Sequence, residues 1–352
     1  MSLSYAQIRD SLPENRLREG AEWLFSPKPL ELTRQQSRVI SRMGHPLAKF
    51  QQASERIYQR SATGSLPSWI SQLLDAGKPD WIIEQQRSVS LQGLTPRVIR
   101  PDLILTENGY SLTELDSVPG GMGITSWLSQ LYSDAGFDVL GGRDGMAQGF
   151  QKLLPNGGDI LISQESADYR PEMEWLAEQV DSNINVTSVE EVQQLDGDAY
   201  RFFEWFDWQN IPAASSLAQK SNLTSPCKPH LEEKLWLALL WSPALQKVWK
   251  QELRSNHHQR LKDIIPYGWV TDPSPLPPHA ALPRLDVQTW SEVGDFSQSQ
   301  RELVLKISGF NELAWGSRGV KIGHDMPAKE WKESLTHATD NFDSEPWVMQ
   351  QF

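Results

Sequence analysis

Cysteine is almost absent from the chain, because its 352 residues include only Cys227. A single thiol excludes an internal disulfide, a Cys-x-x-Cys redox pair and a thiolate-rich metal site. Long apolar runs are absent too. None approaches the roughly 18 residues that a membrane helix needs, and residues 1–19 lack the apolar core of a secretory signal. We therefore expect a cytoplasmic protein that does not enter a membrane.

Positive charge is in short supply, with 33 Lys and Arg against 45 Asp and Glu and a formal net charge of −12. Binding to nucleic-acid backbones and to anionic membranes depends on clustered Lys and Arg. The composition therefore argues against nucleic-acid and membrane partners. Tryptophan, by contrast, is abundant, and we expect the 15 indole rings to fill a large core.

Changes of hydrophobic period and breaks at Pro and Gly divide the sequence into four predicted regions of an α/β (α+β) protein. Apolar residues recur at helical spacing in the first region, as over residues 8–24. Short helices alternate with strands in the third region, where a strand is predicted over 198–208 and a helix over 231–240. Five prolines between 273 and 283 mark a connector within the third region. The four are a helical N-terminal region (1–95), a strand pair with a helix (96–136), a central α/β region (137–300) and a strand-rich end (301–352).

A cluster of charged residues lies on two predicted strands, 98–106 and 110–117. Both stretches alternate in polarity as strands do, and the Asn-Gly pair between them is a strong hairpin signal. The charged residues on these strands are Arg100, Asp102, Glu114 and Asp116.

The length of the loop decides whether the acids meet. A two-residue loop would place Asp102 opposite Leu115 and would send the acids to different faces of the hairpin. A three-residue loop over 107–109, with Gly109 in the left-handed conformation, places Asp102 opposite Glu114 and the arginine opposite the last acid. We predict the three-residue loop.

Three acids and one arginine leave negative charge without compensation. Two carboxylates about 4 Å apart repel by roughly 4 kcal/mol at an effective dielectric constant near 20. A hard divalent cation removes this repulsion, and Mg²⁺ in proteins is held by a few carboxylates together with waters and substrate phosphates. The alternative is a solvated hairpin whose acids face water, and the pattern alone leaves it open.

A second set of residues follows the proline-rich connector. Lys306 lies in an apolar strand predicted at 302–308, where an ammonium is costly unless it meets an anion or reaches water. The next loop carries Gly309, Gly316 and Gly319, whose backbone N–H groups suit a phosphate. The loop is neither a Walker A motif nor a Rossmann fingerprint. An ordinary glycine-bearing hairpin with a surface lysine is the alternative.

A helix predicted over 328–338 and a strand over 346–352 complete the last region. The sequence ends inside this strand without a polar tail. Because chain termini usually lie in polar sequence, we expect that the protein continues beyond Phe352 or is cut short there.

These elements together carry a family resemblance. The lysine-bearing strand, the Gly-rich loop, the helix near Trp331 and the strand at 347–351 resemble the nucleotide-binding half of an ATP-grasp enzyme. The acidic hairpin precedes that half instead of following it. This order resembles the circularly permuted ATP-grasp group that includes glutathionylspermidine synthase, here without an amidase domain. The resemblance implies that 96–136 is the metal-binding half and 301–352 the nucleotide-binding half.

The resemblance implies roles for the hairpin residues. Asp102, Glu114 and Asp116 would hold Mg²⁺, and Arg100 would contact the transferred phosphate. Asp116 departs from the group, which usually has Asn at this position, and the added negative charge would alter the number of metal ions or their affinity.

It also implies roles for residues in the last region. Lys306 would reach the phosphates of ATP, while Gln350 and the backbone of Gln351 would face the adenine. The residues of the loop that closes over the phosphates would be Gly316, Ser317, Arg318 and Gly319.

The sequence also gives expectations for two lysines and two histidines. Lys228 or Lys234 would reach phosphate by comparison with the segment between the two halves of the group, and a solvated lysine is the alternative that we favour. His257 and His258 are expected at the solvated surface, so no general base is assigned.

By the same resemblance the protein is an ATP-dependent carboxylate–amine ligase. ATP would phosphorylate a substrate carboxylate to an acyl phosphate, and an amine would then displace the phosphate. The expected partners are ATP and small-molecule or peptide carboxylate and amine substrates, with Mg²⁺ as cofactor. The alternatives are a non-catalytic nucleotide-binding or regulatory protein of the same fold and a scaffold without a nucleotide site.

Overall fold

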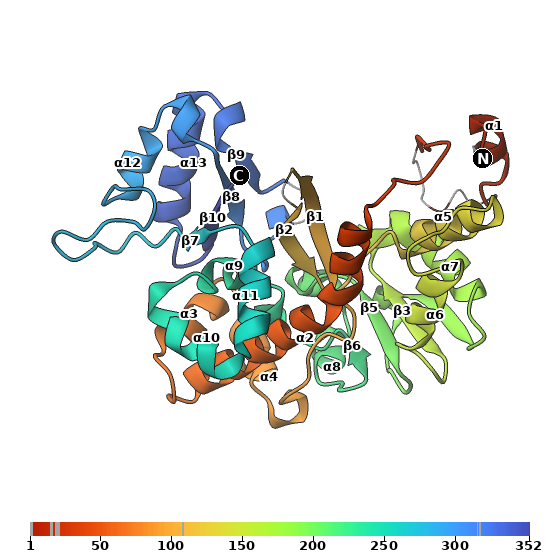
Figure 1. Ribbon diagram of the computed structural model, residues 1–352. Coiled ribbons are helices and arrows are strands. Elements are labelled where there is room, and N and C mark those ends of the chain that lie inside the picture. The colour runs from red at the N-terminus through yellow and green to blue at the C-terminus, as the bar shows by residue number, and fades with distance from the viewer. Residues whose placement is uncertain (1–2, 15–16, 18–21, 108, 315, 317) are drawn as a thin grey trace. The chain divides into compact units, whose positions relative to one another are not determined.

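The computed structural model describes residues 3–14, 17, 22–107, 109–314, 316 and 318–352 (Figure 1). The chain forms two compact units, each assembled from segments that are distant in the sequence. The predicted helical region 1–95 is shared between them, with the division after residue 44. Unit 1 comprises residues 1–44, 96–100 and 117–227, and unit 2 comprises residues 45–95, 101–116 and 228–352.

Unit 1 is built on a four-stranded parallel sheet in the order β4-β3-β5-β6. Parallel neighbours need crossover connections, and those between these strands contain two of the unit's α-helices, Arg170–Glu178 and Ala214–Ala218. Its strands are β3 (Gly158–Ile162), β4 (Ile184–Ser188), β5 (Ala199–Phe202) and β6 (Leu223–Thr224). Its helices are α1 (Tyr5–Asp10), the first part of α2 (Arg34–Ala62), α5 (Met122–Asp134), α6 (Gly145–Gln151), α7 (Arg170–Glu178) and α8 (Ala214–Ala218).

One face of this sheet packs against α5, α6 and α7. Successive side chains on a strand point to opposite faces, so Ile160 and Ile162 of β3 point to the same side. There they meet Phe150 of α6 and Met173 of α7, and all four side chains are almost completely buried. Figure 1 shows the three helices together beside the strands. The predicted α/β character of the central region is therefore present in unit 1.

Unit 2 contains a four-stranded antiparallel sheet in the order β7-β10-β8-β9 and a separate two-stranded sheet of β1 and β2. Its helices are the rest of α2, α3 (Trp69–Asp75), α4 (Asp80–Gln86), α9 (Leu235–Leu239), α10 (Gln246–Glu252), α11 (Ser255–Ile264), α12 (Trp290–Gly294) and α13 (Ala328–Asp340). Its strands are β1 (Arg100–Thr106, with Arg100 in unit 1), β2 (Gly109–Asp116), β7 (Gly268–Val270), β8 (Leu303–Ile307), β9 (Val320–Ile322) and β10 (Trp347–Gln351).

The two faces of the antiparallel sheet have different neighbours. Leu305 of β8 and Met349 of β10 pair across the sheet and pack with Trp290 of α12 and Trp331 of α13. The other face carries Lys306, and α9 packs against β7 and β10. The tryptophan-rich core expected from composition therefore forms on the first face. The buried polar side chain of Lys306 lies on the second face.

Several predicted elements have different bounds. Among the residues of 8–24 that the structure describes, the helical period gives α1 alone, and the predicted helix at 231–240 is reduced to the five residues of α9. The aromatic stretch at 198–208, predicted as one strand, is β5 followed by a 3-10 helix from Trp205 to Asn210. His257 and His258 are buried on α11, not solvated as we expected.

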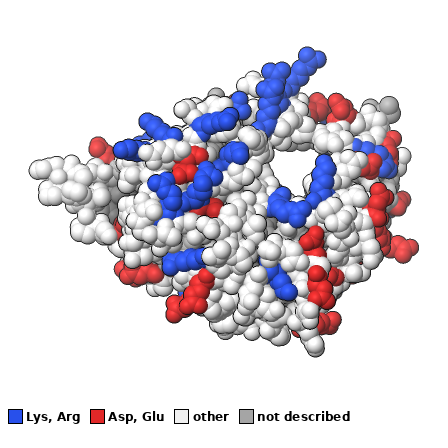
Figure 2. All heavy atoms as spheres, turned by 90° about the horizontal axis from the view of Figure 1, so that it is seen from below, with Lys and Arg blue, Asp and Glu red and all other residues white. Residues whose placement is uncertain are grey.

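Charges of both signs lie on the face that Figure 2 shows. Lys and Arg form several separate groups there, with groups of Asp and Glu between them. The excess of acidic residues therefore does not give a uniformly acidic surface on this face. In the part of the chain that the structure describes, no helix is long and apolar enough to cross a membrane.

A buried polar network joins the helices of unit 2 to the segment before α9. Glu55 of α2 accepts from the Lys228 ammonium and lies 2.8 Å from Nε2 of His230, and all three side chains are at most 3% exposed. His230 stacks on Tyr58, with ring centroids 3.8 Å apart. Burial alone would raise the pKa of Glu55, but the hydrogen bond from His230 and the charge of Lys228 hold it below its ordinary value. Burial lowers the pKa of His230.

Replacing Glu55 tests this network. Glu55→Gln leaves the Lys228 ammonium buried without an anion, so we expect the free energy of unfolding to fall by roughly 3–5 kcal/mol at pH 7. Urea denaturation followed by circular dichroism measures the loss. Lys329→Ala, which removes an ammonium from a side chain that is 86% exposed, is the control and should change the stability by less than about 1 kcal/mol.

The same network sets a pH dependence. The lowered pKa values mean that the unfolded chain binds more protons than the folded chain below pH 6.5 for His230 and below pH 4.5 for Glu55. Stability should therefore fall on acidification through this window, and Glu55→Gln should lose less on acidification than the parent protein does. An equal loss in both proteins would contradict the assignment to Glu55.

Candidate functional site

The acidic hairpin forms with its two predicted strands. β1 and β2 make a two-stranded sheet, and the Thr113 hydroxyl donates to the carbonyl of Asp102 at 3.2 Å. Gly109 has a positive φ of 142°, in the region that favours glycine, as we expected. It belongs to β2, however, so our assignment of Gly109 to the loop is wrong. Asn108, the middle residue of the predicted loop, lies outside the described residues.

Lys306 is buried and engaged on the second face of the antiparallel sheet. Its side chain shares that face with Gln350, because Lys306 pairs with Val348 and Gln350 with Val304. Nζ donates to the Thr113 carbonyl of β2 and to Oε1 of Gln350, both at 3.0 Å. With 7% of its surface exposed, Lys306 is not the surface lysine of the alternative interpretation.

The surroundings of Lys306 lower its pKa. Burial lowers the pKa of Lys306 to about 8, and the nearby Lys234 lowers it as well. The carboxylates of Glu114 and Asp102 act in the opposite direction without restoring the ordinary value. An anion placed beside Nζ would therefore favour the charged form of Lys306.

Lys234 lies in the same cluster and is not the solvated residue that we favoured. It is buried directly before α9, and its Nζ lies 2.7 Å from Oε1 of Glu114. Lys228 is buried as well, but it pairs with Glu55 and is absent from the charges that act on Lys306. Of the two candidate lysines, the structure therefore brings only Lys234 to the hairpin. The purely apolar run Leu235–Leu240 was the sequence signal for its burial.

The carboxylates can hold a metal ion only together with another ligand. Among the described residues, no group of three or more His, Cys, Asp and Glu side chains is placed to bind a metal ion. Asp102 and Glu114 lie close enough to Lys306 for both charges to act on it. Two carboxylates suit Mg²⁺, which usually completes its coordination with phosphate oxygens and waters. The donor set therefore fits Mg²⁺ bound along with a phosphate.

Arg100 and Asp116 end the two strands of the hairpin. Arg100 belongs to unit 1, where its guanidinium donates to the carbonyl of Gly120 at 3.0 Å. Asp116 is partly buried at the last position of β2 in unit 2. The roles expected for these two residues stay predictions.

Gln350 has a donor without a partner beside Lys306. An ammonium only donates, so the hydrogen bond from Lys306 fixes Oε1 as the amide atom that faces it. Nε2 of Gln350 is then left buried, with no hydrogen-bond partner among the described residues. A buried donor of this kind calls for an acceptor from a ligand or water. The backbone N–H of Gln351, by contrast, already donates to the Tyr267 carbonyl, and its side chain accepts from Arg284.

The glycine-bearing loop follows β8 and returns to β9. Gly316 is exposed with a φ of 64°, and Arg318 is exposed and donates to the carbonyl of Glu312 at 2.8 Å. Ser317 lies outside the described residues. Gly319 is buried, and its N–H donates to the Leu313 carbonyl at 2.7 Å. The loop therefore folds back on itself, and Gly319 closes it.

A methyl group at Gly319 has no room. A Cβ there would lie 2.3 Å from Cγ2 of Ile307 and 2.7 Å from the Leu313 carbonyl oxygen. We expect Gly319→Ala to lower the free energy of unfolding by about 1–3 kcal/mol because the closed loop must shift. Urea denaturation measures the loss. Gly149→Ala, where a Cβ meets nothing within 4 Å in a helix, is the matched control and should not destabilise the protein.

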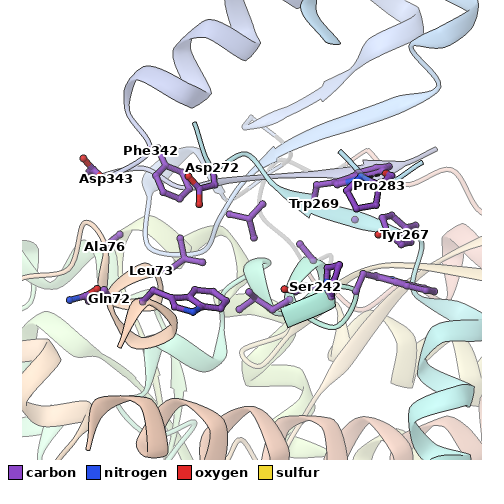
Figure 3. A pocket seen from close by; sticks show the side chains of 17 residues that line it. Gln72, Leu73, Ala76, Ser242, Tyr267, Trp269, Asp272, Pro283, Phe342 and Asp343 are labelled. Atoms are coloured by element: carbon purple, nitrogen blue, oxygen red, sulfur yellow. Dashed lines mark hydrogen bonds between the residues drawn. The ribbon is translucent and has the colours of Figure 1, made fainter. Parts of the chain in front are cut away.

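A separate cavity of about 650 Å³ lies in unit 2 (Figure 3). Figure 3 shows Asp272 and Asp343 at one end and Trp269 and Pro283 at the other. None of the predicted site residues that the structure describes belongs to its lining. The cavity is therefore distinct from the cluster around Lys306. Its aromatic wall consists of Trp69, Trp241, Tyr267, Trp269 and Phe342.

Comparison with known proteins identifies the fold. No family model matches the sequence, and neither does any curated protein. Among solved structures, the chain is similar to a glutathione synthetase-like effector from Globodera pallida in its apo form. The similarity covers 98% of this chain and 80% of that chain, with a TM-score of 0.57 and 12% sequence identity. The chain therefore has a glutathione synthetase-like fold of mixed helix and sheet.

Proposed function

We propose that this glutathione synthetase-like fold serves an ATP-dependent carboxylate–amine ligase of the circularly permuted ATP-grasp type. The observation that supports the proposal most is the pair of buried lysines, Lys306 and Lys234, beside the carboxylates of Glu114 and Asp102. Two buried ammonium groups beside partly exposed carboxylates are costly to maintain without a use for them. In a complex of Mg²⁺ with a triphosphate, the phosphates carry negative charge that suits the two lysines. The metal ion carries positive charge that suits the two carboxylates.

The two lysines would bind the phosphates. Lys306 loses protonation near pH 8 because burial disfavours its charge. A phosphate beside Nζ would favour the charged form, so phosphate binding and protonation of Lys306 would support each other. Lys234 is held by Glu114 at 2.7 Å and would share the phosphate charge. The unpartnered Nε2 of Gln350 would donate to an acceptor atom of the same ligand.

The hairpin would hold Mg²⁺ through Asp102 and Glu114, with phosphate oxygens and waters as the other ligands. Bound Mg²⁺ would neutralise charge that develops on the phosphate oxygens. The protein's own task is then to position the nucleotide and a substrate carboxylate.

The proposed reaction has two transfers. The substrate carboxylate oxygen attacks the γ-phosphorus of ATP, the bond from that phosphorus to ADP breaks, and an acyl phosphate forms. The amine nitrogen then attacks the acyl carbon and displaces inorganic phosphate while the amine proton is lost to solvent. Lys306 would stabilise the charge on the transferred group. Arg100 keeps the role that the family resemblance predicts for it.

Nucleotide binding is the first test. At Mg-ATP concentrations of 100 times Kd, a protein that binds only when folded gains about 2.7 kcal/mol, so we expect a clear rise in its Tm. Asp102→Ala and Glu114→Ala should each remove most of the Mg-dependent part of this rise. Glu84→Ala, which removes an exposed carboxylate from α4, is the matched control and should leave the rise unchanged.

The outcome separates the candidate functions. Stabilisation by Mg-ATP without ADP release in mixtures of carboxylates and amines would favour the non-catalytic nucleotide-binding alternative. No stabilisation by any adenine nucleotide, with or without Mg²⁺, would overturn both the ligase and that alternative.

The affinity for ATP should depend on pH through Lys306. Because phosphate binding favours the charged ammonium, affinity is expected to fall as pH rises through the pKa of about 8. From pH 7.5 to 9.5 the Kd should rise by roughly twentyfold if only the protonated form binds. Isothermal titration calorimetry measures it.

Two variants isolate the contribution of Lys306 to this profile. Lys306→Arg stays charged throughout and should bind with a Kd that is nearly constant with pH. Lys306→Met should bind weakly at every pH. A parent protein whose Kd for ATP does not change between pH 7.5 and 9.5 would remove Lys306 from the phosphate site.

A further inference from the structure

Unit 2 contains a second buried ion pair close to the proposed site. The Lys78 ammonium, from the turn between α3 and α4, pairs with Oε1 of Glu233, and the two side chains are 1% and 2% exposed. Lys78 also donates to the carbonyl of Leu74 at 2.8 Å. Neither residue belongs to the set expected to touch nucleotide or metal.

The other oxygen of Glu233 holds the start of the glycine-bearing loop. Oε2 accepts from the hydroxyl of Ser308 and from the N–H of Gly309, the latter at 2.6 Å. The Ser308 hydroxyl oxygen accepts in turn from the N–H of Leu235 at 3.2 Å. A single carboxylate therefore joins the helical region, the start of α9 and the end of β8.

These contacts flank both lysines of the proposed site. Glu233 directly precedes Lys234, and Ser308 lies two residues after Lys306. The approach is close, because a Cβ at Gly309 would lie 2.6 Å from the carbonyl oxygen of Glu232. A displacement of Glu233 would therefore move both ammonium-bearing segments relative to each other.

We propose that Lys78 and Glu233 are positioning residues that fix the separation of Lys234 and Lys306, and this inference rests on the proposed function. A buried ion pair is often no more stabilising than apolar residues of similar size, so its benefit here lies in geometry. Lys78 reaches the loop in a second way, since Nζ lies 5.3 Å from the centroid of the Phe310 ring. The helical residues 45–95 thereby acquire a role in binding phosphate without touching it.

The test compares single and double variants. Lys78→Met and Glu233→Gln should each lower the Tm, because each leaves the other charge buried and unpaired. The double variant Lys78→Met/Glu233→Gln has no unpaired charge and should recover much of the Tm. Its Kd for Mg-ATP should nevertheless stay at least tenfold weaker than that of the parent protein.

A matched double variant controls for the loss of any buried ion pair. Lys228→Met/Glu55→Gln removes a pair of equal burial in the same unit, and that pair makes none of the contacts of Glu233 to Ser308 and Gly309. This variant should have a Tm similar to that of the Lys78→Met/Glu233→Gln variant and retain the Kd for Mg-ATP of the parent protein. Equal weakening of the Kd by both double variants would overturn the positioning role.

A second readout does not depend on nucleotide. The titration of Lys306 is followed by NMR on protein containing 13C-labelled lysine, with Lys306→Arg used to assign its signal. If Lys78 and Glu233 position β8 and the loop, the midpoint of the Lys306 titration should move by at least half a pH unit in the Lys78→Met/Glu233→Gln variant. It should not move in the Lys228→Met/Glu55→Gln control. An unchanged midpoint and an unchanged Kd would show a purely structural pair.

The two failures can be told apart. A parent protein that binds no nucleotide, but whose Lys306 midpoint moves only in the Lys78→Met/Glu233→Gln variant, would overturn the proposed function and support the positioning role. If the parent protein binds Mg-ATP and the Lys78→Met/Glu233→Gln variant binds it equally well, the proposed function is supported and the positioning role is overturned.

Discussion

The ammonium of Lys306 is the constraint on which the arrangement of unit 2 depends. It lies on a strand flanked by buried leucine, valine and isoleucine, so it must find acceptors on one side only. The Thr113 carbonyl and the Gln350 amide supply them, and the carboxylates of Glu114 and Asp102 supply opposite charge. The hairpin of β1 and β2 is thereby tied to a strand almost 200 residues later in the chain.

The helices of residues 45–95 belong to the same arrangement. Glu55 and Lys78 both extend into the segment 228–235 and pair there with buried charges of opposite sign. Charged groups are poor substitutes for apolar packing, but they require a defined partner at a defined distance. Such partners restrict how the helices can slide against α9. The family resemblance does not include these helices. Their ion pair between Lys78 and Glu233 nevertheless helps to fix the geometry of the candidate site.

The sequence allowed the strands of the hairpin, the strand of Lys306 and the strand at Gln350 to be predicted, because each leaves a local pattern of alternation or of apolar neighbours. It left open whether Lys306 is buried. It did not allow Lys234 to be paired with Glu114 or Lys78 with Glu233. The latter partners are 155 residues apart, and a contact between charges at that separation leaves no periodic trace. The stretch 198–208 was misjudged for a related reason, since aromatic residues favour strands but also fill cores from 3-10 turns.

The division of the chain also bears on how the protein is made. The chain passes between the units after residues 44, 95, 100, 116 and 227, so neither unit is a continuous stretch. During synthesis the helices of 45–95 leave the ribosome long before their partners in 228–352 exist. Until then Phe50 lacks Trp249, the ring on which it stacks in the finished unit. Assembly of unit 2 thus waits for the last third of translation, and apolar surface that lacks its partners during that period is prone to aggregation.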